Sequence, residues 1–566
     1  MRDKKYLINV SRFILLLIGL NVIITSILLL FHISISKFHF FLSLVITIIV
    51  FFCISNCDRK KNIIIVGASI LCLCMVIILE GVVNEIAYDG NLYHKFAVGI
   101  LKMGYNPIYE RVEEYLIQLN IPTEKWYNNQ IWVGSYPKAS WYFDASIYAV
   151  TNWIESAKAF NILVWISSFG ICLDYFLHKL PKKYAYIMGV LLTMTPTCIS
   201  MLFTFYLDGA LGNLLTTSII ILMSVTDEAY QDDKTMQFLY LGICIILCGN
   251  LKTTGLAFEG VYCLSFYILW IIKWGKTEVR TCSLKKAGQA AIYYLVVVGI
   301  TVLIVGAGSY VYNAKTYGNI VYPIGSNMEG FDVNNNLKSV GLEDKPPIVQ
   351  ILSMIFVKTN TNDGLHYLEW KIPFTFDFSQ IKHSVYDVIR GGTGIFYSGI
   401  LCISVVMFIV WRYKFRSSKD EDKCIVYTIL FVSLLLLCIV PAGGQTRYSP
   451  YVFYFVNFTV YLWMLKIHNS EYVARQYKRV LSIVLLFTLL NVLPFTNYLL
   501  RGIMETIRYQ KKYVLIKESG GACIDTKLPG LVFNFIDRGI AYTYDTESEL
   551  KDGNMKYLQL NYNYYK

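Results

Sequence analysis

Charged side chains are scarce in this sequence, in which Asp, Glu, Lys and Arg together make up 16% of 566 residues. A soluble protein carries about a quarter of its residues as charged side chains. Hydrophobic residues make up 55% of the chain and the mean hydropathy is +0.47. The composition therefore excludes an ordinary soluble domain and indicates a protein whose surface faces lipid.

Cysteines with the spacing of a disulfide framework or a metal site are also absent. The 14 cysteines lie mainly inside or at the ends of apolar runs, as Cys72, Cys244 and Cys438 do. Without paired spacing in a loop, neither a disulfide scaffold nor a metal-ligand set is indicated. We interpret them as small, polarisable core residues.

The sequence has few features of a nucleic-acid-binding or secreted protein. The net charge is +12, but the basic residues lie in short loops between apolar runs, which fits membrane topology rather than nucleic acid. The first apolar run, Phe13 to Ile33, is long enough to span a bilayer, and no small-residue cleavage site follows it. We therefore expect a first membrane helix, and no nucleic-acid partner.

Long apolar runs dominate what is present and predict an all-α polytopic membrane protein of about thirteen transmembrane helices. Phe205 and Tyr206 alone separate the fifth and sixth runs, which predicts a tight re-entrant hairpin. We expect a transmembrane module over 1–500 and a tail, 501–566, that forms a small α/β segment. The predicted spans are 13–33, 38–56, 62–83, 158–177, 185–204, 207–226, 235–251, 254–274, 290–313, 395–413, 424–441, 448–467 and 479–500.

Basic residues recur in every second loop, which predicts the orientation of the chain in a multi-pass cell membrane. This pattern places the N-terminus in the cytoplasm and the tail outside, and only the acidic loop 227–234 departs from it. The composition, poor in Ala and rich in Ile, Asn, Lys and Tyr, is typical of an AT-rich bacterium. The basic loops are Arg59 to Lys61, Lys179 to Lys183, Lys273 to Lys286, Arg412 to Lys423 and Arg475 to Arg479.

Two of the loops predicted on the outer side are long, 84–157 and 314–394. Long loops in compact proteins usually serve a function. The first contains two amphipathic segments, 92–104 and 139–153. The second of these, rich in Trp and Tyr, resembles a helix that lies in the membrane interface.

Ionisable residues gather where the chain turns at this outer face. Asp89 follows the third span, Asp208 opens the sixth, Lys252 lies between the seventh and eighth, and Arg447, close to Gln445, precedes the twelfth. An ionisable group near hydrocarbon costs about 2.5–3.5 kcal/mol, so each needs a reason to be there. Their common side predicts one charged site.

Each residue taken alone also has a structural interpretation. Asp89 and Asp208 could cap helices, and Lys252 could pair with Glu259, seven residues later on the same helix face. Arg447 could extend its charged end towards water. His94 could be an ordinary interface residue. Only their convergence favours a functional site.

Short motifs near these residues occur in a fixed order along the chain. Tyr88-Asp-Gly-Asn-Leu-Tyr-His94 opens the first long loop with an acid, an aromatic residue and a histidine. Ser135-Tyr-Pro-Lys138 precedes the second amphipathic segment. Pro196 lies about a dozen residues before Asp208.

Three further motifs follow, and the series resembles the GT-C superfamily of membrane glycosyltransferases. Asn250-Leu-Lys-Thr-Thr-Gly255 is similar to a lysine-bearing turn of many bacterial members, and Arg447-Tyr-Ser-Pro450 to their late Arg-Tyr element. Tyr317-Gly-Asn-Ile-Val-Tyr-Pro323 resembles a Gly-Asn-Pro-x-Tyr-Pro stretch in which Ile320 replaces the first proline. The nearer relatives by these motifs are the lipid A aminoarabinose transferase and the protein O-mannosyltransferases.

The resemblance implies transfer of a sugar from a polyprenyl-phosphate donor to a cell-surface acceptor, with inversion. Some superfamily members use a divalent cation, but no Asp-x-Asp follows Glu85 and Asp89, so we expect no metal cofactor. The residues that it implies are Asp89 as general base, Asp208 as an orienting acid, Lys252, Arg447 and Lys138 on the donor phosphate, and Tyr93, His94 and Gln445 on the substrates.

Three other functions remain open from the sequence. A transporter or lipid-carrier flippase would show inverted repeats and charges near the midplane, and neither is evident. A polysaccharide polymerase or ligase of another fold would have an Arg-rich outer loop, whereas 314–394 contains only Arg390. No sequence feature distinguishes a non-catalytic surface or assembly protein from the enzyme.

Overall fold

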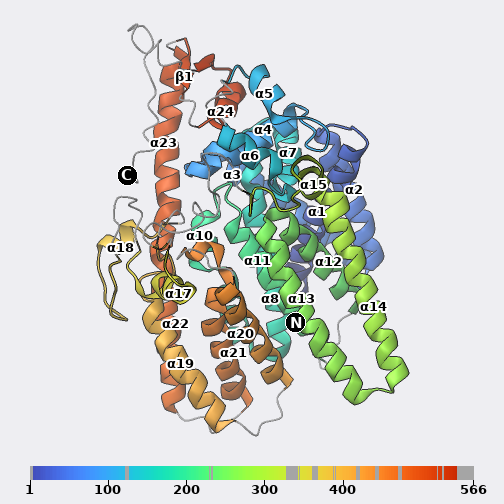
Figure 1. Ribbon diagram of the computed structural model, residues 1–566, viewed down its shortest axis with the longest axis vertical. Helices are drawn as coiled ribbons and strands as arrows, with labels where there is room; N and C mark the ends of the chain where they lie inside the picture. Colours follow the sequence, from blue (N-terminus) through green and yellow to red (C-terminus); the bar gives the residue numbers. More distant parts are fainter. Residues whose placement is uncertain are drawn as a thin grey trace.

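The computed structural model describes residues 4–121, 127–227, 230, 234–326, 342, 344–359, 368–385, 388, 390–415, 421–439, 445–469, 475–518, 520–524 and 528–544. Within these ranges the fold is almost entirely helical (Figure 1), and eleven helices are long and apolar enough to cross a membrane. The predicted class, an all-α polytopic membrane protein, is confirmed.

The eleven candidate spans follow the predicted apolar runs closely. Two are extended by short turns of another helical type, and one consists of two helices joined end to end. Their helices are α1 (Lys4–Leu30), α2 (Lys37–Ile54), α3 (Arg59–Val82), η3 (Ile154–Lys158) with α8 (Ala159–Lys179), α11 (Asp208–Thr226), α12 (Lys234–Leu251), α13 (Thr253–Thr277), α14 (Arg280–Gly299) with η4 (Ile300–Ile304) and η5 (Val305–Gly308), α19 (Tyr397–Lys414), α20 (Glu421–Ile439), and α22 (Arg475–Val492) with η8 (Leu493–Phe495) and α23 (Thr496–Glu518).

The two remaining predicted spans are interrupted near a proline. The run 185–204 divides into α9 (Lys182–Thr193) and α10 (Pro196–Met201), because proline disfavours helical backbone before it. The run 448–467 starts as η6 (Thr446–Tyr448) and η7 (Pro450–Phe453) before α21 (Tyr454–Asn469). The count of thirteen therefore becomes eleven continuous candidates and two broken ones, although apolarity continues through the breaks.

The fifth and sixth runs turn back on each other as the hairpin prediction required. The turn between α10 and α11 is longer than two residues, since it extends from Leu202 to Leu207, and α10 packs against α11. This turn places Tyr206 and Asp208 at one end of the bundle.

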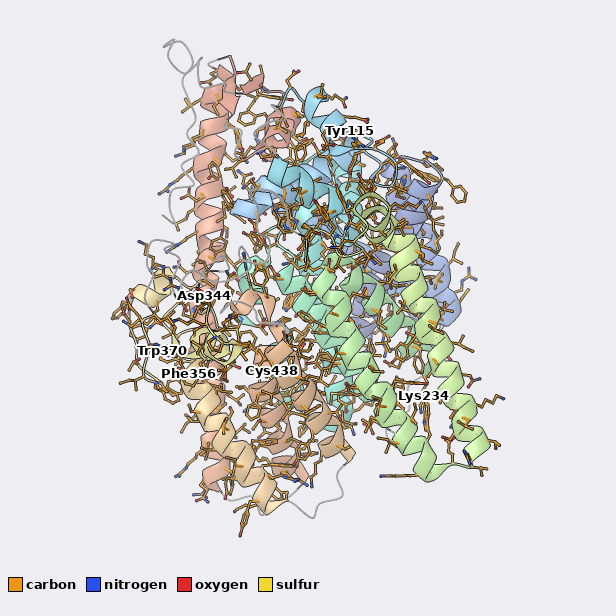
Figure 2. The ribbon with its side chains drawn as sticks, viewed as in Figure 1. Tyr115, Lys234, Asp344, Phe356, Trp370 and Cys438 are labelled. Atoms are coloured by element: carbon orange, nitrogen blue, oxygen red, sulfur yellow. The ribbon has the colours of Figure 1, made fainter. Side chains whose placement is uncertain are left out.

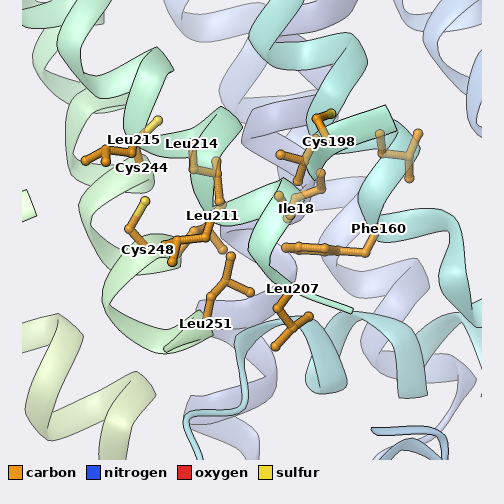
Figure 3. Packing of buried hydrophobic residues seen from close by; sticks show 14 of the residues in the cluster. Ile18, Phe160, Cys198, Leu207, Leu211, Leu214, Leu215, Cys244, Cys248 and Leu251 are labelled. Atoms are coloured by element: carbon orange, nitrogen blue, oxygen red, sulfur yellow. The ribbon is translucent and has the colours of Figure 1, made fainter. Parts of the chain in front are cut away.

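Helix α11 lies at the centre of the bundle and is almost entirely buried. It contacts α8, α10, α12 and α13. Figure 3 shows its Leu211 and Leu214 between Cys248 on one side and Ile18 and Phe160 on the other. A helix that is apolar on all sides belongs in a core. The position of Asp208, its first residue, is therefore set by core packing.

The first long loop folds into four short helices that lie together near the top of Figure 1. The segment 92–104 is helical as predicted, but its first residues, 92–94, belong to a π-helical turn that runs directly into the α-helix. The interface interpretation of 139–153 is wrong, because Ala139 to Tyr148 are all buried against other helices of the protein. The elements are η1 (Gly90–His94), α4 (Lys95–Met103), α5 (Val112–Gln118), α6 (Tyr127–Ser135) and α7 (Ala139–Thr151).

The second long loop is described in part. In Figure 2 its Asp344 and Trp370 lie at mid-height, while Tyr115 of the first loop lies in the upper part and Lys234 lies below mid-height. The end of this loop is tied to the site region by a bridge between Gly391 and Gln445. Its helices are α15 (Tyr310–Tyr317), α17 (Pro347–Phe356) and α18 (Ser379–Lys382).

The chain after residue 500 begins differently from the prediction. The last span does not end there, because α23 continues the helix to Glu518. Beyond it, β1 (Ala522–Ile524), α24 (Leu531–Arg538) and β2 (Tyr542–Tyr544) form a small unit with two parallel strands. This unit matches the predicted α/β segment, and residues 545–566 lie outside the described residues.

Candidate functional site

An ion pair joins the first long loop to the connection that follows α20. Arg447 Nη1 lies 3.8 Å from Asp89 Oδ2, with the side chains 12% and 26% exposed. The backbone N–H of Asp89 donates to Tyr206 Oη at 3.4 Å, so the turn before α11 meets them. The carboxylate makes no capping hydrogen bond to η1. The pair is formed by distant segments and is accessible from outside the protein.

A second ion pair joins α11 to the start of α13. The Lys252 ammonium bonds the Asp208 carboxylate, with the Asp208 side chain 2% exposed and that of Lys252 15% exposed. Asp208 therefore holds Lys252, and it is the first residue of α11 rather than its N-cap, which is Leu207. The predicted alternative of a Lys252–Glu259 pair is wrong, because Glu259 accepts instead from Ser218 Oγ at 2.7 Å.

Tyr448 brings the two pairs together. Arg447 Cζ lies 4.7 Å and Lys252 Nζ 5.1 Å from the centroid of its ring, and Arg447 Nη2 donates to Tyr448 Oη at 2.6 Å. Both cations are attracted to the ring face, by about 0.5–2 kcal/mol each. We call Asp89, Arg447, Tyr448, Lys252 and Asp208 the charged cluster. The predicted convergence of the two carboxylates, Asp89 and Asp208, and the two cations, Lys252 and Arg447, is present in the structure.

Gln445 orients the side chain of Arg447 through a hydrogen bond. Its Oε1 accepts from Arg447 Nε at 3.1 Å, and its backbone is bridged to Gly391. The next residue, Thr446, donates its N–H to Gly391 O at 3.2 Å. The side chain is buried, so Gln445, predicted on the substrate, instead directs the guanidinium.

An aromatic wall of Tyr93, Trp132 and Tyr136 stands beside the charged cluster. The Tyr93 ring lies 6.4 Å from Trp132 and 6.2 Å from Tyr136, between centroids. Burial raises the pKa of Tyr93 and of Tyr136 well above the usual range, and the Asp89 and Asp208 carboxylates add to the effect. Both phenols therefore remain protonated donors. Trp132 was missed because no sequence pattern marks it.

His94 supports this wall from inside the protein. It is buried, and its Nδ1 accepts from Trp141 Nε1 at 2.9 Å. Burial, with Lys252 nearby, lowers its pKa well below the usual value, so the imidazole is neutral with its proton on Nε2. His94 therefore offers an N–H donor and is no proton acceptor at that nitrogen.

Lys138, predicted on the donor phosphate, is turned away from the charged cluster. Its ammonium donates to three backbone carbonyls, those of Gly134 at 2.8 Å, Tyr136 at 2.7 Å and Gly308 at 2.9 Å. An ammonium has three donors, so none is left for a phosphate. Burial lowers the pKa of Lys138 to about 7. The residue joins the first loop to the segment before α15.

Replacing Lys138 with alanine should therefore destabilise the protein. Each buried carbonyl left without a donor costs on the order of 1–3 kcal/mol. We expect a lower midpoint of thermal unfolding in detergent, and unchanged affinity for phosphate-bearing ligands in the protein that remains folded. An unchanged midpoint with weakened phosphate binding would restore the original assignment.

A buried ionic network lies directly behind the loop that carries Asp89. Lys95 Nζ and Lys158 Nζ lie 2.7 Å and 2.6 Å from the carboxylate of Glu155, which also accepts from the backbone N–H of Glu85 at 2.8 Å. Sequence reasoning missed Lys95 and Lys158, and the signal that could have found them is a cation within apolar surroundings. We call Lys95, Glu155, Lys158 and Glu85 the buried network.

Glu85 connects this network to the turn before α11. Its carboxylate accepts from Phe205 N at 2.5 Å and Ala87 N at 2.6 Å, and burial raises its pKa to about 7. It is therefore not directed at a shared ion with Asp89. Among the described residues, no three His, Cys, Asp or Glu side chains are grouped to hold a metal ion.

The charged cluster combines two fixed cations with a partly exposed carboxylate. Arg and Lys side chains of this kind bind phosphate, and a positioned carboxylate can accept a proton. No protein-family model matches the chain, and no curated protein matches its sequence.

Proposed function

We propose that this protein is a GT-C-like membrane glycosyltransferase. It would move a sugar from a polyprenyl-phosphate donor to a glycolipid, wall polysaccharide or protein at the extracytoplasmic face. The observation that supports this most is the meeting of Arg447 and Lys252 on the ring of Tyr448 beside the accessible carboxylate of Asp89.

The donor would bind with its chain in the lipid and its phosphate at the two cations. Arg447 offers a planar fork to two phosphate oxygens, and Lys252 a point charge. Asp208, almost fully buried against Lys252, keeps that ammonium in place. The sugar would face Tyr93 and Trp132, whose rings present apolar surface and whose polar groups donate hydrogen bonds.

The reaction would be a single displacement. Asp89 takes the proton from an acceptor hydroxyl while its oxygen forms a bond to the anomeric carbon. The bond from that carbon to the phosphate oxygen breaks, and its electron pair leaves with the phosphate. The second pKa of a phosphate ester is near 6, so the leaving group needs no proton. Arg447 and Lys252 stabilise the charge that develops on it.

Orientation in the membrane is part of the proposal. Alternating basic loops favour a cytoplasmic N-terminus in a multi-pass bacterial cell membrane, with both long loops outside. A lipid-linked sugar donor suits that location, because nucleotide sugars are cytoplasmic.

Sugar transfer by the purified protein in lipid vesicles tests the proposed function. The assay supplies a radiolabelled polyprenyl-phosphate sugar and an envelope extract from cells that lack the gene. We expect label to pass from the lipid to a glycolipid, polymer or protein, and one surface glycan to be missing in the deletion strain. Movement of the intact lipid across the bilayer without a new glycosidic bond would identify a flippase instead. Loss of polymer length with intact sugar composition would identify a polymerase.

A further inference from the structure

The small unit after α23 is packed directly onto the first long loop. The backbone N–H of Gly530 donates to Asn91 O at 2.9 Å, and a Cβ at position 530 would lie 2.5 Å from that oxygen. Phe533 covers Gly99 so closely that a Cβ there would lie 2.1 Å from its ring. Only glycine fits at these two positions, so the contact is specific.

Asn534 extends from α24 into the buried network. Its side chain is fully buried, its Oδ1 accepts from Lys95 Nζ at 2.8 Å, and its Nδ2 donates to Glu155 Oε1 at 2.7 Å. A neutral amide is the side chain that can serve a cation and an anion at once. The network is complete only with this residue from the far end of the chain.

Two hydrogen bonds connect Asn534 with the loop that carries Asp89. Lys95 Nζ also donates to Asn91 Oδ1 at 2.8 Å. Asn91 Nδ2 in turn donates to Glu85 O and Ala87 O, each at 3.1 Å. Asp89 lies between the bonded residues of this turn, and its own backbone N–H donates to Tyr206 Oη at 3.4 Å.

Further contacts hold α24 against the same helices. Asp537 accepts from Tyr148 Oη and from the backbone N–H of Ile154, both at 2.6 Å. The Arg538 guanidinium lies 4.4 Å from the ring centroid of Trp153. These contacts fix the helix from which Asn534 projects.

We propose that Asn534 is a positioning residue that holds Asp89 in place through Lys95 and Asn91. The effect on transfer rests on the proposed function, whereas the effect on the loop does not. Replacing Asn534 with leucine leaves Lys95 and Glu155 each short of one partner, and a buried charge without its partners is costly. Asn534→Asp sets two carboxylates against each other.

Backbone hydrogen exchange of the segment 85–95 tests the proposal without any assay of transfer. In Asn534→Leu we expect exchange there to be about ten- to a hundredfold faster, the change that an unmet buried donor or acceptor implies. The matched control is Ile536→Ala, an exposed position on the same helix, which should leave exchange unchanged. Unchanged exchange in Asn534→Leu would overturn the proposal.

Kinetics separate positioning from general stability. In Asn534→Leu the turnover number should fall about 10–100-fold, because small displacements of a reacting group are costly, while donor affinity is retained. Loss of donor affinity along with turnover would show that the unit only stabilises the fold.

Hydrogen exchange and sugar transfer test the positioning contact and the proposed function separately. If the wild-type protein transfers no sugar while Asn534→Leu still accelerates exchange in 85–95, the proposed function is wrong and the positioning contact stands. If transfer occurs but exchange is unaffected, the positioning contact is wrong and the proposed function stands.

Discussion

Replacing Asp89 with asparagine is expected to lower sugar transfer about 10²–10⁴-fold, the contribution of a positioned general base. Asparagine has the same size and can still accept a hydrogen bond from Arg447. It cannot take a proton from the acceptor hydroxyl. Because Asp89 is partly exposed and caps no helix, folding and membrane insertion should be unaffected.

The measurement is the initial rate of transfer in vesicles at matched protein amounts. Asp58→Asn is the matched control, because Asp58 is an exposed N-cap at which asparagine serves equally well. Binding of the donor should persist in Asp89→Asn. A rate close to that of the wild type would remove Asp89 as the base and leave the charged cluster as a binding site.

Replacing Arg447 with glutamine should lower turnover about 10²–10³-fold, since it removes a fixed charge aimed at the leaving phosphate. Arg447 is held by Gln445, Tyr448 and Asp89, so its guanidinium is oriented before any ligand binds. Arg447→Lys should recover only part of the loss, because lysine keeps the charge and loses the fork.

Turnover and donor affinity should be measured separately for the Arg447 variants. An effect confined to affinity would make Arg447 a ground-state phosphate ligand without a role in the departure of the phosphate. Arg508→Gln, on the exposed side of α23, is the control and should change neither quantity. A transporter would instead show altered uptake with no change in any bond-forming step.

The alternation of apolar runs and basic loops is local information, and it was enough to predict the membrane class and eleven of the spans. The same information overlooked breaks at Pro196 and Pro450, because apolarity is continuous where the helix is not. It also placed the aromatic segment 139–153 at the interface. Amphipathic composition does not reveal that neighbouring helices will cover a helix on all sides.

Candidate residues were predicted on the reasoning that a charge at the membrane face needs a partner, and this located Asp89, Asp208, Lys252 and Arg447. Which charge meets which could not be predicted. Lys252 forms an ion pair with Asp208 rather than with Glu259, and the Lys138 ammonium donates its hydrogen bonds to backbone carbonyls. The partner of a side chain depends on where the folded backbone places and points it relative to side chains that are distant in the sequence.

The sequence by itself determined that this chain lies in a membrane, which segments form eleven of its long helices, and that charges collect at their turns. Hydrophobicity and the cost of a charge in lipid act residue by residue, so both can be read locally. Only the tertiary structure decided that Tyr448 joins the two ion pairs, and that Asn534 reaches Lys95 and Glu155 from the other end of the chain. Those contacts arise from the packing of distant segments, which no local pattern records.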